Sequence, residues 1–368
     1  MSPLVVKLGT SSLTGGAPQL SRPRMADLVR QIAGLRAGGR QVVLVSSGAI
    51  AAGREALGQP DLPKSIPAKQ MLAAVGQPRL MEIWSGLFGI YGLHTAQVLL
   101  TRADLDARPR FLNARSTIWA LLRQGVLPIV NENDTVATEE IRVGDNDNLS
   151  ALVANLIHAD RLILLTDRDG LFTADPQRVA GAALIERVDA PEIPSELWRA
   201  AGGSGRQGVG GMRTKLEAAE LARRAGAEVV IARADLPDVL IRLESGERLG
   251  TVFTPAGSPP ESFKRFVLAS PAAGALTIDA GAAAALDRGG SLLPSGIVRV
   301  AGEFERGASV RVLAEDGAEL ARGLAAYDQA DCARIAGIQS REIEGALGYY
   351  YGDEVIHRDN LVLLAHQG

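Results

Sequence analysis

The chain contains few of the residues that build disulfide frameworks, histidine metal sites or aromatic cores. Cys332 is the one cysteine in 368 residues, which excludes an internal disulfide framework and predicts a reducing, cytoplasmic location. The four histidines are scattered along the chain, so we expect no histidine-based metal site. Aromatic residues make up 4% of the chain, whereas 41 glycines suit the tight turns and close packing of an α/β protein.

Long apolar runs and an excess of basic charge are also missing. The longest uncharged stretch, residues 85–101, is interrupted by glycines, His94 and Gln97, so we expect no membrane span. No basic leader begins the sequence and Lys7 interrupts its first apolar run, which argues against a signal peptide. The formal net charge of −3 gives no electrostatic reason to expect nucleic-acid binding.

Strand-like and helix-like patterns alternate from the start of the chain to about residue 255. The strand candidates are rich in β-branched residues: LVVKL, QVVLVSSG, TAQVLL, VLPIVNEND, RLILLTD and AEVVIA. Such alternation predicts an α/β fold with a mainly parallel central sheet flanked by helices. The length of 368 residues predicts a second domain.

The composition changes at residues 256–272, where Pro, Gly and Ser predict a linker after a first domain of residues 1–255. Short alternating segments such as GIVRV and SVRVL then predict a small, mostly β domain over residues 273–368. This part has eight Arg, no Lys and fourteen acidic residues, a balance of 8 − 14 = −6. We therefore expect this domain to bind no nucleic acid.

Polar residues and glycines follow four of the predicted strands. In open parallel sheets, ligands bind beyond the carboxyl ends of the strands. A lone serine or threonine at such a position is most simply a helix cap, but four groups along one edge favour a polar cleft. The groups are Gly9, Thr10, Ser11 and Ser12; Ser46, Ser47 and Gly48; Asn131, Glu132, Asn133 and Asp134; and Thr166, Asp167, Asp169 and Gly170.

Lys7 is unusual because it lies inside the first apolar strand, where an unpaired ammonium group would be costly to bury. Two interpretations stay equally open. Either the aliphatic part packs while the charge reaches the surface, or the charge faces a bound anion.

The stretch VGDNDNLS, residues 143–150, places four small polar residues before an apolar run. Its spacing does not fit a calcium-binding loop. A helix beginning near Leu149 would need only one of the four residues, Asp147 or Asn148, as its cap, so the others require another explanation.

The glycine-rich segment GGSGRQGVGGMRTK, residues 202–215, resembles a dinucleotide fingerprint but lacks the strand that must precede one. It is not a Walker-type phosphate loop either. A glycine-rich loop that runs into a helix carrying Lys215 suits a polyphosphate, with a plain surface loop as the alternative.

Taken together, several motifs resemble the bacterial glutamate 5-kinases of the amino-acid kinase family. The resemblance runs from residue 4 to the end, and the tail is similar to a PUA domain. It implies ATP-dependent phosphorylation of the side-chain carboxylate of L-glutamate to L-glutamyl 5-phosphate, the first step of proline biosynthesis, with feedback inhibition by proline. The motifs include VVKLGTSSLTGG, VSSGAIAAGRE, KQMLAAVGQ, VNENDTVA, VGDNDNLSALVA, LLTDRDGLFTADP, GGMRTKLEAA and GSLLPSGIVRVAGEFERGASVRV.

The resemblance also implies roles for individual residues. The catalytic residues would be Lys7 and Lys215, on the ATP phosphates, and Asp147, which would orient them. Glutamate would be bound by Ser47, Asp134 and Asn146. ATP would contact Lys7, Gly9, Thr10, Thr166, Asp167, Val209, Gly210, Gly211, Met212, Arg213, Thr214 and Lys215. Val209 stands where relatives often carry threonine, which puts a side-chain contact at that position in doubt.

The cofactors implied are ATP and Mg²⁺, the metal being held mainly by phosphate oxygens and water rather than by a protein site. A homo-oligomer, dimer or tetramer, and coupling to glutamyl phosphate reductase are further expectations from the resemblance. The alternatives are an aspartate, N-acetylglutamate, carbamate or nucleotide monophosphate kinase, because one fold serves all of them. An RNA-binding protein with an inert kinase-like domain is the alternative from another class.

Overall fold

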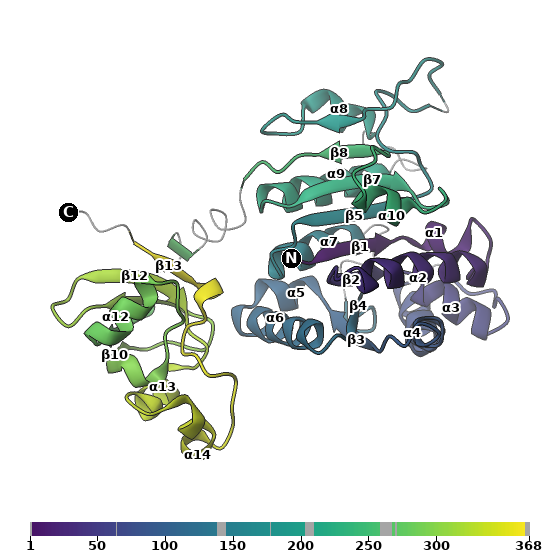
Figure 1. Ribbon diagram of the computed structural model, residues 1–368. Helices are drawn as coiled ribbons and strands as arrows, with labels where there is room; N and C mark the ends of the chain where they lie inside the picture. Colours follow the sequence, from purple (N-terminus) through teal and green to yellow (C-terminus); the bar gives the residue numbers. More distant parts are fainter. Residues whose placement is uncertain are drawn as a thin grey trace. The chain divides into compact units, whose positions relative to one another are not determined.

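The computed structural model describes residues 2–63, 65–137, 145–176, 178–202, 210–257, 267–268 and 271–364. Contacts divide the chain into two units (Figure 1). The first comprises Met1–Leu105 and Arg115–Pro259, and the second comprises Asp106–Ala114 and Pro260–Gly368. Most of the expected linker, 256–272, lies outside the described residues.

The strands of the first unit form one sheet of eight, in the order β3-β4-β2-β1-β5-β7-β8-β6. Every pairing is parallel except that of β7 with β8, which confirms the mainly parallel α/β architecture. The sequence does not predict β6 and β8, because strands of two and three residues carry no readable period. The strands are β1 (Leu4–Leu8), β2 (Val42–Ser46), β3 (Thr95–Leu100), β4 (Leu127–Glu132), β5 (Arg161–Thr166), β6 (Arg187–Val188), β7 (Glu228–Arg233) and β8 (Thr251–Phe253).

The helices of this part of the chain fill the connections between the strands, as expected for parallel pairing. They are α1 (Thr10–Thr14), α2 (Arg22–Ala37), α3 (Ala49–Ala56), α4 (Ile66–Gly89), α5 (Arg102–Asp106), α6 (Arg108–Arg123), α7 (Asp145–Leu156), α8 (Ser195–Ala200), α9 (Gly210–Arg224) and α10 (Val239–Glu244). The expectation that a helix begins near Leu149 is wrong, since α7 already begins at Asp145.

Residues of β1 alternate between the two faces of the sheet, as in any strand. Leu4, Val6 and Leu8 pack into one apolar cluster with residues of α2, α4 and α10. Val5 and Lys7 point to the opposite face of the sheet, where Lys7 contacts Asp147 of α7. The side chain of Lys7 is therefore directed to the face that α7 covers, and it is only 3% exposed, which excludes the interpretation that its charge reaches the surface.

The second unit contains a five-stranded sheet in the order β10-β9-β11-β12-β13. Its apolar core includes Leu276, Val310, Val312 and Tyr327. This architecture confirms the expected small, β-rich C-terminal part. Its elements are β9 (Gly274–Ile278), α12 (Ala280–Asp287), β10 (Ile297–Gly302), β11 (Ser309–Leu313), β12 (Glu319–Leu324), α13 (Gln329–Ile335), α14 (Ile343–Leu347) and β13 (Leu361–Leu363), with short 3₁₀ turns at Pro294–Gly296, Ser340–Glu342 and Arg358–Asn360.

Helices α3 and α4 approach each other at two glycines. A Cβ atom on Gly76 would lie 1.8 Å from the carbonyl oxygen of Ala49, and one on Gly53 would lie 2.0 Å from that of Leu72. Any larger side chain would force the helices apart. This contact holds the start of α3, and with it the end of β2, in a fixed place against α4.

We expect Gly76→Ala to lower the free energy of unfolding by about 3 kcal/mol, because the added methyl group overlaps the backbone of α3. Denaturant unfolding measures the change. Gly86→Ala is the matched control on the same helix: nothing lies within 4 Å of its Cβ position, so the replacement should stabilise the helix by about 0.5–1 kcal/mol. Similar effects of the two replacements would contradict the packing argument.

Candidate active site

A cavity of about 700 Å³ lies where β1, β2, β4 and β5 end, the edge at which the polar groups are expected from the sequence. It is also lined by residues of α7 and α9. Twelve of the predicted site residues line it together: Lys7, Gly9, Thr10, Ser47, Asp134, Asn146, Asp147, Thr166, Asp167, Gly211, Met212 and Lys215. The structure therefore brings into one cavity residues that are up to 208 positions apart in the sequence (215 − 7).

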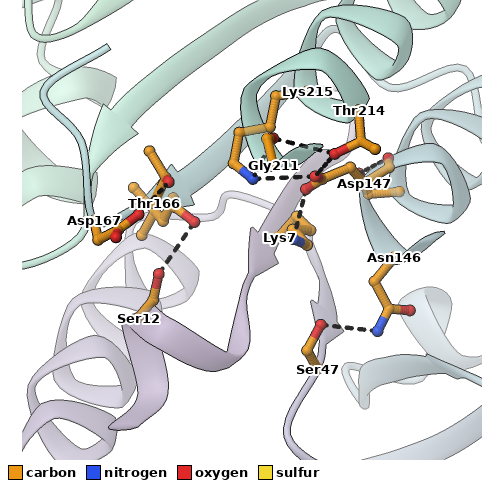
Figure 2. A network of polar contacts seen from close by, with 12 residues as sticks. Lys7, Ser12, Ser47, Asn146, Asp147, Thr166, Asp167, Gly211, Thr214 and Lys215 are labelled. Atoms are coloured by element: carbon orange, nitrogen blue, oxygen red, sulfur yellow. Dashed lines mark hydrogen bonds and ion pairs between the residues drawn. The ribbon is translucent and has the colours of Figure 1, made fainter. Parts of the chain in front are cut away.

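Three charged side chains form a buried cluster at one side of the cavity (Figure 2). Lys7 Nζ lies 2.5 Å from Asp147 Oδ1, and Lys215 Nζ lies 3.1 Å from Asp147 Oδ2. The side chain of Asp147 is 1% exposed. Two ammonium groups and one carboxylate leave a net charge of 2 − 1 = +1, so the cluster is suited to an anion in the cavity.

The hydrogen bonds of α9 orient the cluster further. The hydroxyl of Thr214 donates to Asp147 Oδ2 at 2.8 Å, and Lys215 Nζ donates to the carbonyl oxygen of Gly211 at 3.2 Å. Thr214, which the resemblance assigns to ATP, thus lies behind the carboxylate and is not a lining residue of the cavity. Helices α7 and α9 pack against each other, which brings Asp147 and Lys215 together although 68 positions separate them.

The charges of the cluster shift one another's proton equilibria. Burial by itself would raise the pKa of Asp147, but the attraction of Lys7 and Lys215 outweighs it and holds that pKa below its usual range. Burial lowers the pKa of Lys7, and the attraction of Asp147 opposes this change. Asp147 is therefore a carboxylate committed to two cations and unsuited to accepting a proton.

Glycine at position 9 keeps the space beside the cluster open. A Cβ atom there would lie 3.5 Å from Lys7 Nζ, in van der Waals contact with the ammonium group. Gly9 precedes Thr10, and both line the cavity directly after β1. A ligand can therefore approach Lys7 from this side without meeting a side chain of residue 9.

The amides and hydroxyls at the ends of β2 and β4 lie at another part of the cavity. The side-chain amide of Asn146 donates to Ser47 Oγ at 2.8 Å and to Asn131 Oδ1 at 3.0 Å. Figure 2 shows Asn146 and Ser47 directed toward each other, below the lysine cluster. Asp134 follows β4 and supplies a carboxylate to the same cavity. Donors, acceptors and one negative charge thus accompany the positive cluster.

The remaining predicted contacts lie near the end of β5 and the start of α9. Thr166 donates its hydroxyl hydrogen to Asp167 Oδ1 at 3.1 Å, and both residues line the cavity. Arg213 pairs with Glu217 at 3.2 Å and is not a lining residue. Gly210 begins α9, while Val209 lies outside the described residues.

Sequence reasoning missed Lys69 and Arg168 as lining residues of the cavity. Lys69 lies in α4, and the residues around it in the sequence give no sign that its side chain faces a cavity. Arg168 follows the polar end of β5, so the rule that ligands bind beyond the strands would have been sufficient to include it.

The described ranges contain neither a candidate membrane span nor a candidate metal site. No helix there has the length and apolar character needed to cross a membrane. Within the same ranges, no three His, Cys, Asp or Glu side chains are grouped so that they would hold a metal ion.

Comparison with known proteins gives two family matches and a set of close relatives. Residues 2–233 match the amino acid kinase family and residues 274–347 match the PUA domain. The chain is 57% identical to a glutamate 5-kinase of Photobacterium profundum over 364 residues, which cover 98% of this chain and 96% of that protein. It is 54% identical to a glutamate 5-kinase of Deinococcus radiodurans, with 98% and 99% covered.

We expect Asp147→Asn to lower the free energy of unfolding at pH 7 by about 3 kcal/mol, because two buried ammonium groups lose their counter-charge. The lowered pKa of Lys7 should then fall further, so the deficit should shrink as the pH rises toward the unfolded lysine pKa of about 10.4. Denaturant unfolding between about pH 6 and pH 10, below the pKa of lysine in the unfolded chain, measures this trend.

In the unaltered protein, the lowered pKa of Asp147 predicts that the free energy of unfolding falls at acidic pH. Its stabilisation should be complete above the unfolded aspartate pKa of about 3.9 and be lost as the pH falls through the folded value. Asp61→Asn, which replaces an exposed carboxyl group, is the control and should leave the free energy of unfolding unchanged in both pH ranges. A pH-independent deficit in Asp147→Asn would contradict the charge argument.

Proposed function

The chain belongs to the amino acid kinase family, and from this premise we propose that it transfers the γ-phosphoryl group of ATP to the side-chain carboxylate of L-glutamate. The product is L-glutamyl 5-phosphate. The observation that supports the proposal most directly is the buried Lys7–Asp147–Lys215 cluster, with its net positive charge, on the wall of a cavity that Ser47, Asp134 and Asn146 also line.

The chemistry requires no general base. A glutamate carboxylate has a pKa of about 4.3 and is therefore already ionised and nucleophilic at neutral pH. One carboxylate oxygen attacks the γ-phosphorus, a new O–P bond forms, and the bond to the β-phosphate oxygen breaks, which leaves ADP. The protein must align two anions and stabilise the charge on the transferring oxygens.

Lys7 and Lys215 would supply that stabilisation. Both ammonium groups are held by the same carboxylate, so their positions are fixed before the ligand arrives. Preorganised charges of this kind need no reorganisation during the reaction. Asp147, whose pKa is lowered, acts as the orienting anion that holds both ammonium groups.

ATP enters as its Mg²⁺ complex, which we treat as the substrate. Mg²⁺ prefers several water molecules and phosphate oxygens with few protein ligands. Asp147 already holds two ammonium groups, so it is a poor candidate for a direct metal ligand. The contacts expected of the nucleotide are with Gly9, Thr10, Thr166, Asp167 and the start of α9.

Glutamate would lie between the lysine cluster and the ends of β2 and β4. Its side-chain carboxylate faces the cluster, while Ser47 and Asn146 contact the rest of the molecule. Asp134 is suited to the ammonium group, since a charge-assisted hydrogen bond is stronger than a neutral one.

We also infer a place for this reaction at the start of proline biosynthesis, with proline as a feedback inhibitor that overlaps the glutamate site. Association into a homo-oligomer and coupling to a reductase that consumes the acyl phosphate belong to the same proposal. The C-terminal unit carries more acidic than basic residues, so we propose a structural or regulatory role for it rather than RNA binding.

The test of the reaction combines ATP, Mg²⁺ and L-glutamate with hydroxylamine, which traps the acyl phosphate as a hydroxamate. We expect hydroxamate with glutamate and little with aspartate or N-acetylglutamate. Asp147→Ala should lower kcat by at least about 10²-fold, because both lysines lose their orientation. Glu82→Ala, which removes an exposed carboxylate of α4, should leave kcat unchanged. Product with aspartate or N-acetylglutamate but not glutamate would refute the assignment.

A second measurement tests the overlap with proline. Asn146→Ala should raise both the KM for glutamate and the proline concentration needed for half-inhibition, each by about tenfold, since one lost hydrogen bond in a cavity costs about 1–2 kcal/mol. Initial rates at several glutamate and proline concentrations measure the two effects. A raised KM with unchanged sensitivity to proline would show that the two ligands bind at separate sites.

A further inference from the structure

A chain of side-chain amides leads away from the glutamate end of the cavity toward α4. The side-chain Nδ2 of Asn131 donates to Gln77 Oε1 at 2.7 Å. Asn131 Oδ1 in turn accepts from Asn146 Nδ2 at 3.0 Å, and the same Nδ2 donates to Ser47 Oγ at 2.8 Å. We refer to Gln77, Asn131, Asn146 and Ser47 as the amide relay. Gln77 is not a lining residue of the 700 Å³ cavity; it lines a second, smaller one.

The backbone fixes the direction of the relay. The backbone N–H of Glu132 donates to Asn131 Oδ1 at 2.9 Å. A backbone N–H can only donate, so Asn131 must keep its oxygen on that side and its Nδ2 toward Gln77. Gln77 must then present Oε1 to Asn131, although this leaves its own Nε2 buried and without a partner among the described residues.

The same direction is passed on to the cavity. Because Asn131 offers an acceptor, Asn146 turns its Nδ2 toward both Asn131 and Ser47 and uses both hydrogens there. Ser47 Oγ therefore accepts from Asn146, and its own hydroxyl hydrogen has no acceptor among the described residues. Ser47 lines the cavity, so this hydrogen is available to an oxygen of a bound ligand.

Reversing the relay would remove that donor. If Asn131 rotated by half a turn, its Nδ2 would face Asn146, which would rotate as well and present its oxygen to Ser47. The hydroxyl of Ser47 would then donate to Asn146 instead of to the ligand. The backbone N–H of Glu132 opposes this reversal, because it would then face Asn131 Nδ2 instead of an acceptor. Gln77 stabilises the present direction from the other side, because its Oε1 is the acceptor of the buried Asn131 Nδ2.

We propose that Gln77 is a positioning residue that acts through Asn131 and Asn146 to keep the hydroxyl hydrogen of Ser47 directed at an oxygen of the amino-acid substrate. This inference rests on the proposed phosphorylation of glutamate and adds a residue that, together with the backbone N–H of Glu132, stabilises the hydrogen-bonding direction of its binding site. Gln77 itself touches neither the substrate nor the nucleotide.

The variant that tests it is Gln77→Met, which keeps the length of the side chain but removes the acceptor. We expect the KM for glutamate to rise about tenfold, with the KM for ATP within about twofold of the unaltered value, because only the relay is affected. Gln77→Glu keeps an acceptor oxygen for Asn131 and should restore the KM for glutamate to within about threefold. Gln97→Met is the matched control, because Gln97 lines the same small cavity as Gln77 but takes no part in the relay.

A double-mutant cycle separates positioning from a purely structural role. If Gln77 acts through Ser47, then Gln77→Met should raise the KM for glutamate by less than about twofold in a Ser47→Ala background. Melting temperatures are recorded for each variant, and Gln77→Leu replaces Gln77→Met if the latter does not fold. Additive effects in the cycle, or equal changes in both KM values, would overturn the inference.

The same assay keeps the two proposals apart. If the unaltered protein forms hydroxamate with glutamate while the cycle is additive, the proposed function stands and the role of Gln77 falls. If the unaltered protein forms none with glutamate, both proposals fall together.

Discussion

The site depends on one interaction: a single carboxylate, that of Asp147, stabilises two buried ammonium groups. An isolated buried charge is too costly to persist, and a buried pair is stable only with good geometry and further hydrogen bonds. Asp147 meets that condition through Lys7, Lys215 and Thr214. Since these groups come from β1, α7 and α9, the cluster forms only when all three elements are in their final places.

The surplus positive charge of the cluster links this constraint to the phosphoryl transfer that we propose. A cluster with equal charges would be stable but inert toward an anion, whereas two lysines with one carboxylate leave a site that a phosphate can complete. Under the proposed function, stability and phosphoryl transfer therefore make opposing demands on the same three side chains. Burial and attraction oppose each other at both groups: burial prevails in the lowered pKa of Lys7, and attraction prevails in the lowered pKa of Asp147.

A second constraint acts on the part of the cavity that we propose to bind the amino acid. The glycine contacts between α3 and α4 fix the end of β2, which Ser47 directly follows, relative to α4, which carries Gln77. The relay that joins these two residues needs hydrogen-bond distances of about 3 Å at each step. Close packing at Gly53 and Gly76 thus supports the amide relay, because contacts between backbones allow the two helices less relative movement than contacts between side chains would.

The sequence by itself determined the alternating architecture, the sheet edge that carries the polar residues, and, through the resemblance, twelve of the residues that line the cavity. Local patterns were sufficient for these conclusions because strand period, turn residues and the rule for strand ends are all short-range. The tertiary structure alone decided whether Lys7 reaches the surface, since parity in β1 has no meaning until α7 covers one face. It also showed that Asp147 lies within α7 rather than before it, and that Gln77 joins the site through Asn131, 54 positions away, because hydrogen bonds between distant segments leave no period in the sequence.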